Sequence, residues 1–123
     1  SESFQKGCIL VKARKFQEAV ELLDEAVKLN DKEADHFAWR GWAGFLAARD
    51  KAAAKSVAFK DLEAALKLNP KCAQGLYFAG QITKLGGDAA GALKWFKKAL
   101  TVDPNHVEAQ REVRAAATTQ KPK

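Results

Sequence analysis

The segment at residues 58–70, AFKDLEAALKLNP, recurs in outline at residues 92–104 as ALKWFKKALTVDP. The two segments place a small residue, a large apolar residue, a second small residue and a proline at the same four positions: Ala58, Leu62, Ala65 and Pro70 in the first, and Ala92, Phe96, Ala99 and Pro104 in the second. Residues three or four positions apart share one face of a helix. Two small residues on that face let a second helix approach, and the large residue between them fills the hollow.

A third copy of the pattern lies nearer the N-terminus, where Ala19, Leu23 and Ala26 have the spacing of Ala58, Leu62 and Ala65. A glycine recurs with the same offsets. The spacing from Gly7 to Gly41 equals the spacing from Ala58 to Ala92. The spacing from Gly41 to Gly80 equals the spacing from Ala19 to Ala58. One unit is therefore present three times, with five extra residues between Gly41 and Ala58. A two-helix unit with a period near 34 is typical of a helical solenoid, which displays a surface and does not enclose a reaction pocket.

The composition is that of a soluble globular chain. Of the 123 residues, 47% are hydrophobic and 29% are charged, and there are only three prolines to interrupt helices. No apolar run approaches the roughly 20 residues that span a bilayer, and residues 1–6 contain no apolar signal segment. We therefore expect one domain or a short repeat array, without a membrane span.

The two cysteines, Cys8 and Cys72, fall in the first and third units. A helical hairpin should separate them, and packed helices lie about 8–10 Å apart, whereas bridged Cα atoms lie within about 7 Å of each other. We therefore expect no internal disulfide, which suits a reducing cytoplasm. Two thiols without further ligands at motif spacing also predict no metal site.

The net charge is +6, and the charges are unevenly distributed. Carboxylates gather in the predicted helix at 15–29 and lysines in the predicted helix at 88–102: Glu18, Glu21, Asp24 and Glu25 against Lys94, Lys97 and Lys98. We expect solvated outer faces, with head-to-tail stacking of like molecules as the alternative. Nucleic-acid binding would require Lys51, Lys55 and Lys60 to share one face with the later lysines, and it is the less favoured interpretation.

The spacing of apolar residues and the positions of helix-capping and helix-ending residues predict seven helices and a frayed tail at 118–123. The helices are expected at residues 2–12, 15–29, 32–48, 51–68, 70–85, 88–102 and 104–117. Several side chains are expected to cap helix starts: Asn30 with Glu33, Asp50, Asp88, and the pairs Asn69-Pro70 and Asp103-Pro104. The pair Gly86-Gly87 is expected to end a helix, because glycine adopts the left-handed conformation without strain.

These small and large residues in register resemble the tetratricopeptide repeat. The strongest copy, at 73–106, keeps Leu76, Ala79-Gly80, Gly87-Asp88, Ala92, Phe96, Ala99 and Pro104. The other copies lie at about 1–31 and 34–70, and the chain is also loosely similar to short repeat domains of large multidomain bacterial proteins. The resemblance implies an all-α, right-handed solenoid of three helical hairpins. We expect a single domain at 1–117, closed by a capping helix at about 104–117. One departure is that Lys6, Arg40 and Ala79 stand where the family has a large aliphatic residue.

In this family the first helix of each unit lines a concave groove, which implies a scaffold or adaptor that binds a protein or peptide partner. The groove residues implied here are Phe4, Cys8, Val11, Lys12, Asp35, Ala38, Trp42, Phe45, Gln74, Tyr77, Gln81 and Lys84. Phe4 and Cys8 stand where the family's clamp for a peptide C-terminal carboxylate has lysine and asparagine, so we expect apolar segments to be preferred. The alternative partner is another copy of the chain, which would make the protein a homo-oligomer.

The sequence does not favour an enzyme. His36 and His106 fall in different units, without a ligand or nucleophile at motif spacing, and are expected to be ordinary surface or boundary histidines. The sequence Gly86-Gly87-Asp88 is a turn and lacks the context of a phosphate-binding loop. We therefore expect no catalytic residue and no cofactor.

Overall fold

The computed structural model describes residues 1–119, and those residues form seven α-helices and no strand. The helices are α1 (Glu2–Lys12), α2 (Phe16–Leu29), α3 (Ala34–Ala47), α4 (Lys51–Leu68), α5 (Ala73–Leu85), α6 (Ala89–Val102) and α7 (Val107–Thr119). Residues 118 and 119 of the expected tail belong to α7, and residues 120–123 lie outside the described part of the chain.

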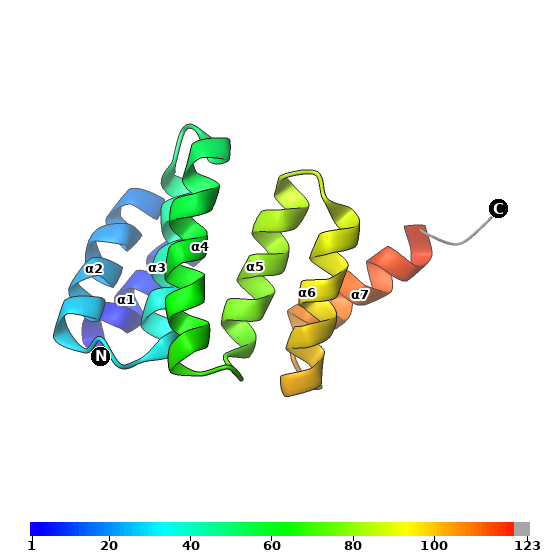
Figure 1. The fold of residues 1–123 in the computed structure, drawn as a ribbon. Coiled ribbons are helices and arrows are strands. Elements are labelled where there is room, and N and C mark those ends of the chain that lie inside the picture. The colour runs from blue at the N-terminus through cyan, green and yellow to red at the C-terminus, as the bar shows by residue number, and fades with distance from the viewer. Residues whose placement is uncertain (120–123) are drawn as a thin grey trace.

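The helices are arranged as three successive hairpins. Helix α1 packs on α2, α3 on α4, and α5 on α6, while α2 also contacts α3 and α4 contacts α5. Figure 1 shows α2, α4 and α6 toward the viewer with α1 and α3 behind them, and α7 against α6 at the C-terminal end. This arrangement confirms the predicted all-α solenoid of helical hairpins.

Each hairpin is held by a glycine that lies against its second helix. A methyl group placed on Gly7 would come within 2.8 Å of the Leu23 side chain, and one on Gly80 within 2.7 Å of the Phe96 ring. At Gly41 the same methyl group would lie 2.9 Å from the Ala58 carbonyl oxygen. Real side chains cannot occupy these positions without separating the helices.

Alanines complete the contact between the helices of a hairpin. The predicted small rows are buried, with relative exposures of 3% or less: Ala19, Ala26, Ala58, Ala65, Ala92 and Ala99. Leu23 and Leu62 lie between these rows and are almost completely buried. The packing of small residues around a large one is therefore confirmed.

The starts of three helices differ from the sequence prediction. Asn30, Asn69 and Asp103 end the preceding helix, since their backbone N–H groups donate to carbonyls of that helix. The side-chain oxygen of each residue then accepts the N–H two residues further on, which makes a turn. Helices α3, α5 and α7 consequently begin later, and the expected capping box of Asn30 with Glu33 is wrong.

The turns inside the first and third hairpins share one geometry. Gly87 follows α5 with φ +92°, as the sequence predicts, and Arg14 occupies the equivalent place after α1 with φ 65°. In both turns the next N–H donates to a carbonyl five residues earlier, from Lys15 to Leu10 and from Asp88 to Thr83. Two of the predicted caps are confirmed, because Asp50 and Asp88 accept backbone N–H groups at the starts of α4 and α6.

The glycine contact predicts opposite effects at two glycines. Gly80→Ala should lower the free energy of unfolding by about 1–3 kcal/mol, because the new methyl group overlaps the Phe96 ring. Gly44→Ala is the matched control, since nothing lies within 4 Å of that position in α3, and it should raise stability by about 0.5–1 kcal/mol. Urea denaturation followed by circular dichroism measures both, and equal effects would contradict the packing described.

Candidate functional site

The surface of α1, α3 and α5 that faces away from α2, α4 and α6 is termed here the first-helix face. Three of the residues predicted for it, Val11, Ala38 and Phe45, are buried, so their side chains belong to the core. The others keep exposed surface: Phe4, Cys8, Trp42, Gln74, Tyr77 and Gln81 are half-buried, and Lys12, Asp35 and Lys84 are exposed. The available surface therefore consists of aromatic, thiol and amide groups with charged residues around them.

Aromatic rings from α3 and α5 pack around the buried Phe78. The Trp42 ring stacks on Phe78 with centroids 5.2 Å apart and an interplanar angle of 10°, and the Tyr77 ring lies 5.8 Å from Phe78. Trp39 meets Phe78 edge-on at 5.0 Å. We call Trp39, Trp42, Tyr77 and Phe78 the aromatic cluster. Because these rings pack on one another, their exposed parts are held in fixed positions.

Phe78, which joins the cluster, was absent from the predicted groove residues. It is 2% exposed, and Ile82, one turn further along α5, is fully buried. That spacing of four residues was the available signal, since apolar residues one turn apart mark the inward side of a helix.

The two histidines, expected at the surface or at its boundary with the core, are buried. His36 is 5% exposed and donates from Nδ1 to the carbonyl oxygens of Ala26 and Asn30, at 3.2 and 3.3 Å. The Phe4 ring stacks on His36 with centroids 4.6 Å apart. His36 therefore connects the end of α2 to α3 and positions Phe4 at the edge of the first-helix face.

His106 caps α7 and contacts the third unit. Its Nδ1 accepts the backbone N–H of Ala109 at 3.1 Å, which leaves the proton on Nε2, 3.1 Å from the Gln74 side-chain oxygen. The Tyr77 ring lies 5.1 Å from the imidazole. A histidine thus replaces the acidic or hydroxyl side chain that commonly caps a helix.

A carboxylate of α7 accepts hydrogen bonds from polar side chains of α5. Glu112 accepts hydrogen bonds from Gln81 at 3.1 Å and from Lys84 at 2.8 Å. Gln81 also donates to the Tyr77 hydroxyl group at 2.6 Å, and burial raises the pKa of Tyr77. The third-unit part of the first-helix face is therefore engaged by α7, whereas Lys12 and Asp35 remain exposed on the first two units.

Both cysteines are free thiols close to the same carboxylate. The Cys72 thiol donates to Asp35 at 3.4 Å, and the charge of Asp35 also acts on Cys8. Burial raises the pKa of each thiol from 9.0 to about 11, and the negative charge of Asp35 adds to that effect. Both thiols are therefore protonated and unreactive at neutral pH.

The raised thiol pKa values predict slow alkylation. At pH 8 the folded protein should react with iodoacetamide at least about tenfold more slowly than the chain unfolded in urea, because less thiolate is present. The rate should rise through about pH 11. The protonated thiols favour the fold below pH 9, and that stability is lost as the pH rises through the raised pKa. A folded-state rate that already levels off near pH 9 would contradict this environment.

Arg40 explains one departure from the family pattern. Its guanidinium donates to Asp61 of α4 at 2.8 and 3.0 Å and to Asp24 of α2 at 3.4 Å. The hydrogen bond to Asp61 is the main cause that raises the Arg40 pKa. Arg40 therefore joins α3 to the second helices of two units, where an aliphatic residue could only pack.

Residues 1–119 contain no group of three or more histidine, cysteine or acidic side chains placed to hold a metal ion. No helix in this part of the chain combines the length and apolar character needed to cross a membrane.

Comparison with known proteins gives a consistent set of similarities. A sequence profile described as "Tetratricopeptide repeat" matches residues 4–59 and 55–107. The "Hsp70-Hsp90 organizing protein 1" of Glycine max is 30% identical over 107 residues, which are 87% of this chain and 18% of that protein. The chain thus spans less than a fifth of that relative's length.

Two solved structures illustrate the shared fold. The first repeat domain of Spaghetti (RPAP3) bound to the HSP90 peptide SRMEEVD has a TM-score of 0.75 and 21% identity, over 95% of this chain and 91% of that one. The Arabidopsis OM64 domain has a TM-score of 0.72 and 23% identity, over 92% and 89% of the two chains. At these identities the likeness concerns the fold alone.

Proposed function

Because the chain belongs to the tetratricopeptide repeat family, we propose that it is a protein-interaction module that binds a peptide segment of a partner on the first-helix face. The observation that carries this proposal is the aromatic cluster, whose half-buried members Trp42 and Tyr77 come from neighbouring units. Exposed charges at Lys12 and Asp35 accompany it. Rigid aromatic anchors with polar neighbours are the usual centres of peptide-binding surfaces.

We propose that an apolar side chain of the partner, rather than its C-terminal carboxylate, is recognised. Phe4 and the protonated Cys8 bring no positive charge to the two positions where the family's carboxylate clamp has lysine and asparagine, and Lys84 of the third unit is already paired with Glu112. An apolar side chain can instead pack against Trp42 without leaving a charge unpaired. The partner segment would then be selected by shape and apolar area.

The compartment and the extent of the domain are part of the same proposal. Free thiols at Cys8 and Cys72 suit a cytoplasmic location. The contacts of α7 with α5 and α6 support a single domain over residues 1–117 that includes the last helix. The chemistry of the face requires no cofactor.

The proposed function makes two predictions, of which the first concerns the aromatic cluster. A peptide selected from a displayed library should bind Trp42→Leu and Tyr77→Leu at least about tenfold more weakly than wild type, because truncating an aromatic anchor removes most of its contact area. Trp95→Leu is the control, since Trp95 is half-buried on α6, away from the first-helix face. Fluorescence anisotropy measures the affinities, and circular dichroism checks the fold. Unchanged affinity in both cluster variants would refute the site.

The second prediction concerns the peptide terminus. The peptide SRMEEVD and its C-terminally amidated form should bind equally weakly, within about twofold, because Phe4 and Cys8 offer no cation to the carboxylate. Isothermal titration calorimetry with both peptides under the same buffer measures the difference. Strong binding that disappears on amidation would show carboxylate recognition and contradict the proposed selectivity.

A further inference from the structure

We propose that the side of the molecule opposite the first-helix face carries a second interaction surface, a lysine-rimmed apolar hollow beside α4 and α6 that receives α2 of another copy. This surface is separate from the proposed peptide site, and either proposal can fail without the other. The argument rests on the hollow, the sign of the charges around it and the exposed residues of α2.

The hollow lies where the second and third units meet. It has a volume of about 420 Å³, and its apolar lining comes from α4, α5 and α6: Leu66, Leu76, Trp95 and Val102. A second, more open hollow of about 590 Å³ on α4 shares Leu66 with it. The second hollow is also lined by Lys60, Glu63 and Lys67, and Trp95 in the first hollow is half-buried.

Lysines line both hollows, Lys98 the first and Lys60 and Lys67 the second. Lys94 and Lys97 of α6 are exposed as well. The Lys98 ammonium group lies over the Trp95 ring, 5.0 Å from its centroid. The two helices contain only two carboxylates, and one of them, Asp61, is taken by Arg40. Glu63 lines the second hollow beside Lys60 and Lys67, so lysines outnumber carboxylates around the two hollows.

Helix α2 has the complementary surface. Glu18, Glu21 and Glu25 are exposed, and Leu29 is 69% exposed at the end of the helix. Leu22 is half-buried, and positions 18, 22, 25 and 29 follow one another along a single strip of the helix, three or four residues apart. The carboxylates of this strip are opposite in charge to the lysines, and its leucines could pack into the apolar hollow.

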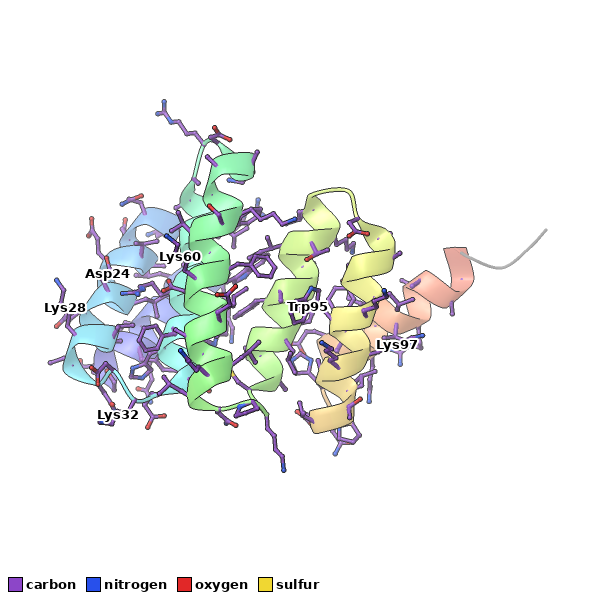
Figure 2. The ribbon with its side chains drawn as sticks, viewed as in Figure 1. Asp24, Lys28, Lys32, Lys60, Trp95 and Lys97 are labelled. Carbon is purple, nitrogen blue, oxygen red and sulfur yellow. The ribbon has the colours of Figure 1, made fainter. Side chains whose placement is uncertain are left out.

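The two surfaces cannot meet within one molecule. Asp24 marks α2 at one end of the row of helices, and Trp95 and Lys97 mark α6 toward the other end (Figure 2). A contact between α2 of one copy and the α4/α6 surface of the next is therefore heterologous, and each added copy leaves a free surface at both ends. Association should be weak and sensitive to salt, because exposed ion pairs contribute little and are screened.

Sedimentation velocity of the intact chain tests this inference. At low ionic strength the mean sedimentation coefficient should rise with protein concentration, and added sodium chloride should reverse the rise. A monomer at every concentration and salt level would overturn the proposal. It would do so even if the lysine surface then bound an acidic peptide or a nucleic acid.

Two charge-reversal variants locate the contact. Glu21→Lys with Glu25→Lys, and Lys94→Glu with Lys98→Glu, should each weaken self-association at least about tenfold, because like charges then face each other. An equimolar mixture of the two variants should restore association, since each supplies the surface that the other needs. Failure of the mixture to associate would overturn the assignment of α2 as the occupant.

A matched control separates the specific contact from net charge. Arg49→Glu with Arg114→Glu makes the same change in net charge as the lysine variant, at exposed residues outside both surfaces. It should associate as wild type does, and equal loss in this control would overturn the proposal. Trp42→Leu should also leave self-association unchanged, which distinguishes failure here from failure of the peptide site.

Discussion

The close approach of a glycine in the first helix of each hairpin to the second helix is the contact on which the structure depends. Gly7 lies against Leu23 and Gly80 against Phe96, and buried alanines flank both contacts. This packing sets how closely the two helices lie and therefore how the next hairpin stacks on them. The positions of the aromatic cluster and of the lysine rim follow from that stacking.

The two layers of helices carry different chemistry. The first helices expose rings and amides with a mixture of charges, whereas the outer helices separate acidic from basic residues along the length of the solenoid. Arg40 joins the layers through Asp24 and Asp61, so these two carboxylates serve the fold, whereas Glu18, Glu21 and Glu25 of α2 are exposed. A repeat array can present two unrelated surfaces in this way because each side of the hairpin varies independently.

The sequence predicts the helices and their pairing because the packing pattern is periodic and local, as Ala58, Leu62 and Ala65 show. It places the helix starts wrongly at Asn69 and Asp103, since the same residue types can end one helix or begin another. Helical spacing assigned Val11, Ala38 and Phe45 to a face but not their depth, which depends on the neighbouring helix. The contacts of His106 with Gln74 and of Glu112 with Lys84 join distant positions that no local pattern relates.

The hydrogen bonds of Glu112 have a thermodynamic consequence for the third unit. A ligand that uses Gln81 or Lys84 must displace the Glu112 carboxylate, so part of its binding energy is spent on loosening α7. Linkage is reciprocal. Any contact that held α7 more firmly in its place would therefore weaken the affinity for such a ligand by the same factor. The last helix would thus compete with such a ligand, and its amide exchange rates would report whether the ligand is bound on α5.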